Sequence, residues 1–131
     1  MRHPITALAL AAGLFVPATA ALAAANSGNL DAMKYVLSLD PDRMLSFYRT
    51  RAGLTKKAEP YTGWDGAGRQ LTGHIAGHHL SAVSLMYQAT GNVKFKQRAD
   101  YLVAEMKAVQ DAHKDGYCGA IEGGKEAFQA L

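Results

Sequence analysis

Three histidines and two glycines fall within one short run of this chain, and their spacing could build a polar pocket. His74 and His78 each follow a glycine, Gly73 and Gly77, and His79 comes next. In a helix, at about 100° per residue, His74 and His78 would lie about 40° apart on one face. His79 would point about 100° away from His78, so a pocket on that face would meet it only obliquely. Imidazoles in this arrangement can bind a metal, carry a proton or hydrogen-bond a polar ligand.

The glycines have the same four-residue spacing as the histidines. They leave a strip without side chains, where another backbone or a ligand could approach closely. Each glycine inside a helix lowers its stability by roughly 0.5–1 kcal/mol relative to alanine. Two glycines within one turn therefore indicate a need for space rather than for helix stability.

Metal and serine chemistry both lack parts that they need. Two histidines four residues apart can reach one ion, but a metalloprotease helix also requires Glu directly after the first histidine, where this chain has Ile75. No cysteine or carboxylate at a ligand spacing completes a tetrahedral set, so we expect this chain to bind no metal or other cofactor by itself. The Gly-x-Ser-x-Gly elbow of serine hydrolases does not occur either.

The single tryptophan of the chain lies shortly before the histidines, in the segment Tyr61-Thr62-Gly63-Trp64-Asp65. Aromatic rings stack on sugar C–H faces, and carboxylates and imidazoles hydrogen-bond hydroxyl groups. We therefore predict a carbohydrate site formed by Trp64, Asp65, His74 and His78, with His79 and Tyr61 as secondary candidates. In the structural alternative, Trp64 and Tyr61 anchor their loop to the helices, and the histidines are satisfied polar groups at a helix start.

The elements that must position these side chains are helices. Asp40 is a good N-cap and Pro41 suits the first helical position, so a short helix is predicted from there until Gly53 ends it. No segment has the alternation of a convincing strand. The sequence therefore predicts an all-α fold.

Two longer helices follow and predict an αα-hairpin over Leu71–His113. Apolar and small residues recur with a helical period from Leu71 to about Thr90, and Gly91 stands where a left-handed C-cap is wanted. Asn92 can cap a second helix, which runs to about His113. A connection as short as Gly91-Asn92 forces antiparallel neighbours. The apolar stripes are too narrow to close a core, so we expect further helices to pack on the hairpin.

Residues 1–23 are typical of a signal peptide, with a basic start, the apolar run Ile5–Val16 and small residues at A-x-A spacing. We expect a lead-in over residues 24–36 and export to the periplasm or the extracellular space, without stable membrane association after cleavage. A retained anchor is the alternative, against which Pro17 interrupts the apolar run. The net charge of +3 without a basic stripe predicts no nucleic-acid partner.

The end of the chain holds a loop with several glycines and Cys118, the only cysteine. A single cysteine cannot form an internal disulfide, and we interpret it as an inert thiol. An amphipathic helix opens at Gly124 and reaches Leu131 without a stop signal. We therefore expect a fragment of a larger domain.

Six segments agree in order and spacing with a known family: Leu39–Arg49, Ala52–Leu54, Tyr61–Asp65, Gly73–Ala82, Ala89–Gly91 and Gly116–Tyr117. Together they resemble the N-terminal part of the bacterial β-L-arabinofuranosidase-like glycoside hydrolases of families 127 and 146, once grouped as a domain of unknown function. The string Gly-His-x-x-Gly-His-x-Leu-Ser-Ala is the most specific part. The likeness extends over residues 37–131, nearly all of the chain that follows the leader.

The resemblance implies an (α/α)6 toroid as the catalytic domain, with residues 37–131 supplying its opening helices. It implies retaining hydrolysis of non-reducing-end β-L-arabinofuranosides in an arabinose-containing glycan. The family uses a zinc-bound cysteine thiolate as nucleophile and a glutamate as acid/base. Neither can be placed in this chain, so zinc is implied only for the full-length site, and we expect the fragment alone to be inactive.

A substrate-pocket role is what the resemblance carries over to Trp64, Asp65, His74 and His78. His79 departs from the pattern, because tyrosine is common at that position in relatives. Two alternatives stay open: a small exported helical module that binds a sugar or a metal, and a non-catalytic relative of the family.

Overall fold

The computed structural model describes residues 29–68 and 71–130. The chain divides into two compact units, residues 1–31 and 32–131. The predicted signal peptide lies outside the described residues. The described part of the chain is helical and contains no strand, which confirms the all-α prediction.

The predicted lead-in is partly helical, since residues 29–38 form a helix that the sequence reasoning missed. Within the second unit, Met33, Val36 and Leu37 pack against the hydrophobic core. Their spacing of three and one residues places them on one helix face, the signal that could have found this helix. The guanidinium of Arg98 donates to the carbonyl oxygen of Leu37 (3.2 Å), within this helix, and to that of Leu39 (2.5 Å), just beyond it.

The short helix predicted after Asp40 is present, but it is divided into α2 (Pro41–Met44) and α3 (Ser46–Arg51). Asp40 is the N-cap, as predicted, and its Oδ1 accepts a hydrogen bond of 2.9 Å from the Asp42 amide. Leu45 separates the two helices with ψ near zero, and its side chain is fully buried.

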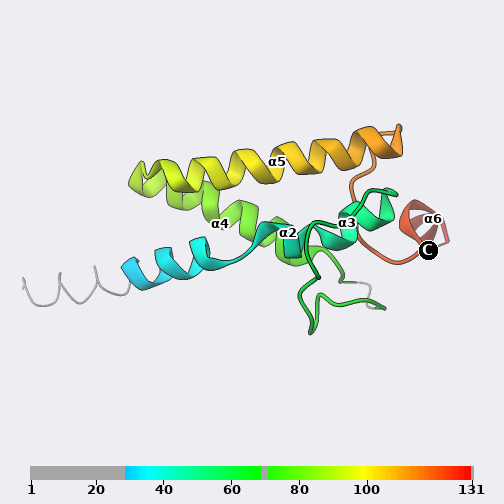
Figure 1. Cartoon of the computed structure of the whole chain (residues 1–131), viewed down its shortest axis with the longest axis horizontal. Coiled ribbons are helices and arrows are strands. Elements are labelled where there is room, and N and C mark those ends of the chain that lie inside the picture. The colour runs from blue at the N-terminus through cyan, green and yellow to red at the C-terminus, as the bar shows by residue number, and fades with distance from the viewer. Residues whose placement is uncertain (1–28, 69–70, 131) are drawn as a thin grey trace, which may run out of the picture. The chain divides into compact units, whose positions relative to one another are not determined.

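The αα-hairpin is confirmed as α4 (His74–Thr90) and α5 (Val93–His113), which lie antiparallel and side by side (Figure 1). Gly91 has the left-handed φ of 67° that was predicted for a C-cap. Asn92 caps α5 by accepting from the Lys94 amide at 3.1 Å. The start differs: α4 begins at His74 rather than at Leu71, because Gly73 has a φ of 96°, which is outside the helical region.

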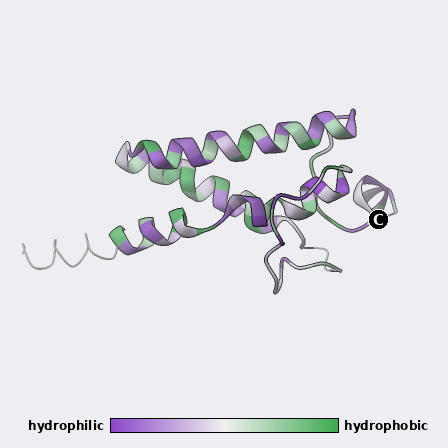
Figure 2. Ribbon diagram, in the orientation of Figure 1, coloured by the Kyte–Doolittle hydropathy of each residue, from purple (hydrophilic) through white to green (hydrophobic). Residues whose placement is uncertain are grey.

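The core lies between the hairpin and α2, and hydrophobic residues recur along both long helices (Figure 2). Its buried side chains are Met44, Leu45, Ala76, Val83, Phe95 and Leu102. Full burial of a side chain such as Phe95 or Leu102 contributes about 1.5–3 kcal/mol. Leu85 is an apolar residue of α4, but it is 64% exposed because the buried face of that helix runs through Ala76, His79 and Val83.

A chain of paired polar side chains holds α2 and α3 against α5; we call it the paired network. Its members are Asp42, Arg49, Lys57, Tyr101 and Glu105. Glu105 accepts from Arg49 Nη1 at 2.5 Å and from Lys57 Nζ at 2.7 Å. Tyr101 donates to an Asp42 carboxylate oxygen and accepts from Lys57 at 3.0 Å. This network fixes α3, which contributes to the site described next.

The loop after α5 leads to α6 (Gly124–Gln129), a short helix where the sequence predicted an opening amphipathic one. Asp115 and Lys125 close the ends of this loop with an ion pair of 2.6 Å. Among the helices of the described residues, none has the length and apolar character needed to cross a membrane.

Candidate substrate-binding site

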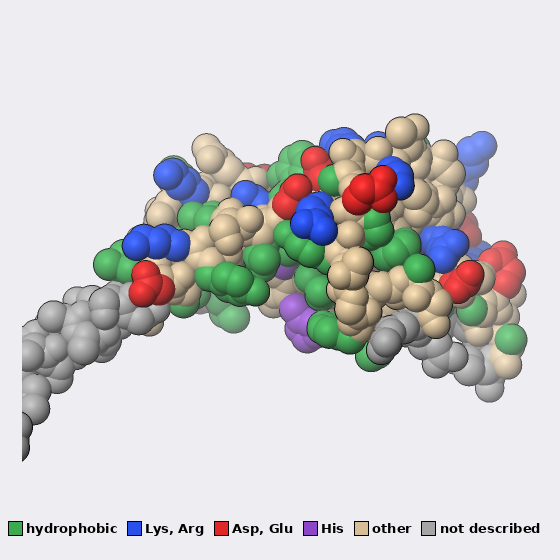
Figure 3. Space-filling model, turned by 60° about the horizontal axis from the view of Figure 1, so that its bottom comes forward, with side chains coloured by type: hydrophobic (Ala, Val, Ile, Leu, Met, Phe, Trp, Pro, Cys, Tyr) green, Lys and Arg blue, Asp and Glu red, His purple; other side chains and the backbone are tan. Residues whose placement is uncertain are grey.

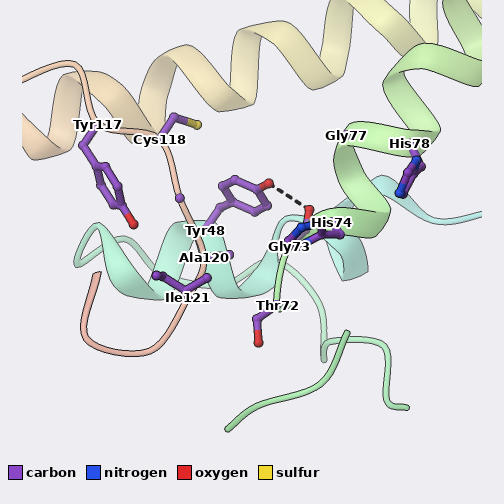
Figure 4. Close-up of a pocket in the computed structure, with 11 residues that line it drawn as sticks. Tyr48, Thr72, Gly73, His74, Gly77, His78, Tyr117, Cys118, Ala120 and Ile121 are labelled. Carbon is purple, nitrogen blue, oxygen red and sulfur yellow. Dashed lines mark hydrogen bonds between the residues drawn. The ribbon is translucent and has the colours of Figure 1, made fainter. Parts of the chain in front are cut away.

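A cavity of about 390 Å³ lies where the start of α4 meets the loop between α5 and α6 (Figure 4). The α4 side presents Gly73, His74, Gly77 and His78. The loop side consists of residues 117–121, and Tyr48 of α3 lies between the two sides. Three segments that are distant in the sequence therefore build one concave surface.

The two glycines have different surroundings. A Cβ on Gly73 would lie 2.8 Å from the Ala120 Cβ and 2.9 Å from Tyr48 Cε2, which real side chains do not tolerate. A Cβ on Gly77 would meet nothing within 4 Å. The protein itself therefore occupies the space beside Gly73, whereas Gly77 leaves its part of the cavity open.

The start of α4 is capped from outside the helix, because its N-cap residue Gly73 has no side chain. Asp65 is only 4% exposed, and its Oδ1 accepts from the Ile75 amide at 3.2 Å. A carboxylate at this position satisfies a free amide and interacts favourably with the helix dipole. The structure thus gives Asp65 a capping role, and its contact with a ligand stays a prediction.

The structure brings His74 and His78 to the same cavity, and both are exposed. His74 Nδ1 lies 2.7 Å from the Leu71 carbonyl oxygen, which accepts from it in the tautomer protonated at Nδ1. That tautomer leaves Nε2 of His74 as an acceptor. Within the described residues, the His78 ring makes no hydrogen bond. In the space-filling view, histidine side chains reach the surface beside hydrophobic groups, apart from the clusters of opposite charge (Figure 3).

Trp64 stands next to this surface without lining the cavity itself. Its ring centroid lies 6.5 Å from that of His74, with the two planes tilted by 60°. The side chain is 47% exposed, unusual for so large an apolar group. Trp64 is therefore placed to extend the His74 side of the cavity with an aromatic face.

The two secondary candidates lie away from the cavity. His79 is 4% exposed on the core side of α4, and its Nε2 is buried without a hydrogen-bond partner among the described residues. Burial, and then the charge of Arg98, lowers the pKa of His79. Tyr61 accepts from the Asp40 amide at 3.0 Å and lies under the Arg43 guanidinium, 4.1 Å from the ring centroid.

Sequence reasoning missed Tyr48 and the loop residues as lining groups. Tyr48 lies in the short helix that is predicted after Asp40, and its residue type alone gives no sign of the cavity. Its hydroxyl donates to the Gly73 carbonyl at 2.8 Å (Figure 4). Burial first, and then the nearby Cys118, Asp65 and Tyr117, raise the pKa of Tyr48 to about 12.

Cys118 lines the cavity but does not resemble an activated nucleophile. Its thiol is half-buried and lies 3.7 Å from the Met106 carbonyl oxygen. Burial raises its pKa, which favours the thiol over the thiolate. Nowhere in the described residues do three or more His, Cys, Asp or Glu side chains gather so that they could hold a metal ion. These residues therefore do not fit the zinc site that the family resemblance implied.

Residues 27–130 match a family model described as "Beta-L-arabinofuranosidase, GH127 catalytic domain". No individual curated protein matches the chain. The matched region starts before residue 37, where the sequence resemblance began, and includes the helix at residues 29–38. It also includes every residue that lines the cavity. The chain therefore belongs to the GH127 β-L-arabinofuranosidase catalytic-domain family of glycoside hydrolases.

Proposed function

We propose that this chain supplies part of the substrate pocket of an exported glycoside hydrolase that releases L-arabinose from non-reducing-end β-L-arabinofuranosides with retention. The observation that carries the proposal is that His74 and His78 line one cavity in a chain matched to the GH127 catalytic domain. The signal-like residues 1–23 support export. The substrate would be an arabinose-containing glycan.

The cavity suits a sugar in size and chemistry. Its volume of about 390 Å³ is at the small end of the range for ligand pockets, roughly 300–1,000 Å³. His74 and His78 offer ring nitrogens to hydroxyl groups, and the exposed face of Trp64 can stack on C–H groups. Since Gly77 adds no side chain between the histidines, a ring could approach the α4 backbone closely.

The described residues are assigned binding and orientation rather than bond cleavage. Burial raises the pKa of Cys118 and so favours its thiol form, and among the described residues no set of three possible metal ligands includes it. We therefore propose that the nucleophile and the acid/base come from other parts of the full-length protein. A wall that positions the sugar raises the rate by holding the glycosidic bond where those groups can reach it.

The test is hydrolysis of an aryl β-L-arabinofuranoside by the full-length gene product. Wild type should release L-arabinose, and His78→Ala should lower kcat/KM about tenfold, since one hydrogen bond to the substrate is lost. Gln88→Ala removes an exposed polar side chain from the same helix and should change kcat/KM less than about twofold.

The results separate the parts of the proposal. If the wild-type protein releases no L-arabinose, the proposed activity is wrong. If His78→Ala retains full kcat/KM, His78 does not belong to the binding surface. Release of the α anomer as first product, seen by NMR, would contradict retention.

A further inference from the structure

The beginning of α4 is held by a hydrogen bond from another helix. Tyr48 of α3 donates its hydroxyl hydrogen to the Gly73 carbonyl at 2.8 Å. The same ring fills the space beside Gly73, where a Cβ would come within 2.9 Å of Cε2. Both the ring and the hydroxyl of Tyr48 therefore contact Gly73, the residue that precedes His74.

This contact matters because the helix start lacks a cap of its own. Gly73 has a left-handed φ of 96° and no side chain, so it cannot accept a hydrogen bond from the first-turn amides as a serine or aspartate would. The first turn of a helix frays readily when its free groups find no partner. Asp65 accepts from the Ile75 amide, and Tyr48 donates to the Gly73 carbonyl, so two residues outside α4 hold its first residues.

The helix that carries Tyr48 is held to α5 and to the loop after α3 by side-chain contacts. Its neighbour Arg49 pairs with Glu105 of α5 at 2.5 Å, and Arg49 Nε also donates to the Thr55 carbonyl at 2.7 Å. Since its pKa is raised to about 12, the Tyr48 hydroxyl remains protonated, and so remains a donor, at neutral pH. The hydrogen bond therefore links the paired network to the first histidine of the cavity.

We propose that Tyr48 is a positioning residue, whose hydroxyl fixes the Gly73 carbonyl and thereby the direction from which His74 and His78 enter the cavity. This inference rests on the proposed function, because it names what orients the same binding surface. Tyr48 has no assigned part in bond cleavage. Its role is expressed through substrate binding.

The test compares Tyr48→Phe with Tyr61→Phe in the full-length protein. Tyr48→Phe keeps the ring that packs on Gly73 and removes only the donor. Tyr61→Phe removes a hydroxyl bonded to the Asp40 amide, outside the cavity. Amide hydrogen exchange reports on the first turn of α4, and kinetics report on the substrate.

In Tyr48→Phe, amide exchange at Ile75 and Ala76 should accelerate about threefold to tenfold, the effect of one lost hydrogen bond. Exchange near Val83, further along α4, should stay as in wild type. KM should rise by a similar factor with kcat changed less than about twofold, which is the signature of lost uniform binding. Tyr61→Phe should leave all three quantities unchanged.

Unchanged exchange at Ile75 and Ala76 would overturn the inference. So would uniform acceleration along α4 and α5, because that pattern belongs to general destabilisation. Local acceleration with an unaltered KM would show that the bond does not serve binding, and would also overturn it. A wild-type protein without hydrolase activity would instead refute the proposed function, and the exchange pattern would still decide whether Tyr48 holds the helix start.

Discussion

Polar side chains gather in two regions of the described residues, the paired network and the cavity, and the two differ in what their polar atoms contact. In the paired network, the Glu105 carboxylate forms salt bridges with Arg49 and Lys57, and its side chain is only 14% exposed. Beside the cavity, Trp64, His74 and His78 are exposed, and within the described residues His78 has no hydrogen-bond partner. The polar groups of the paired network bond one another and hold the helices together. Those beside the cavity are exposed and can bond a ligand.

Tyr48 and Asp65 lie at the start of α4 but use their polar groups on the fold, as the paired network does. Each is largely buried, and each uses its polar group on the backbone at the start of α4. Such contacts stabilise a helix end whose N-cap residue, Gly73, has no side chain that could cap it. Mutations in the paired network should therefore change the free energy of unfolding. Mutations of the exposed residues beside the cavity should change the affinity for the sugar.

The largest change in the free energy of unfolding is expected at Gly73, whose surroundings are packed, in contrast to Gly77, which faces open space. Gly73→Ala forces a left-handed φ on alanine and a clash with Tyr48 and Ala120. It should lower the free energy of unfolding by about 2–4 kcal/mol, from overpacking together with the left-handed penalty. In Gly77→Ala the added methyl group meets open space, so the free energy of unfolding should rise by about 0.5–1 kcal/mol.

Urea denaturation of both variants gives these two free energies directly. Equal destabilisation by the two substitutions would contradict the distinction between a packed and an open glycine. Gly77→Ala should also weaken sugar binding despite its greater stability, since its methyl group projects into the cavity.

The next effect concerns the paired network. Glu105→Ala leaves Arg49 and Lys57 without their shared carboxylate and should cost about 1.5–3 kcal/mol, the range for hydrogen bonds to charged groups. Asp100→Ala breaks an exposed pair with Lys96 on the same helix and should cost less than about 0.5 kcal/mol. Thermal denaturation at neutral pH distinguishes them. Comparable losses in both variants would show that burial of the Glu105 pair adds nothing.

The smallest effect is a dependence of stability on pH that arises from His79. Burial, and then Arg98, places the pKa of His79 below its ordinary value of 6.5. The unfolded chain therefore takes up a proton at a higher pH than the folded chain, so stability is complete above about 6.5 and declines as the pH falls from there towards the folded pKa. His79→Leu should abolish this decline, whereas His78→Ala should retain it. Parallel profiles for wild type and His79→Leu, measured by denaturation between neutral and mildly acidic pH, would rule out His79 as the source.

Much of the fold could be predicted because its signals are local. Asp40, Gly91 and Asn92 act as caps within a few residues of their own position, and each was identified from residue type alone. The division at Leu45 and the late start of α4 were missed. Both depend on tertiary contacts, the burial of Leu45 and the packing of Ala120 against Gly73.

The site was predictable on one side only. The helical period was enough to pair His74 with His78 and to separate His79 from them, and the structure places them accordingly. The opposite side of the cavity comes from the loop at residues 117–121, and Tyr48 comes from α3. Their approach depends on the path of the chain across many residues, for which the sequence has no local pattern. Asp65 was recognised as a carboxylate near the site, but its capping contact with Ile75 was not foreseen.

The most direct test of the central claim is a titration of the full-length protein with methyl β-L-arabinofuranoside, followed by NMR of the histidine ring signals. We expect saturable shifts for His74 and His78, no comparable shift for the buried His79, and, in His78→Ala, a His74 shift whose midpoint needs about tenfold more sugar. Hydrolysis of the sugar without any change at His74 and His78, or shifts confined to His113, would contradict it.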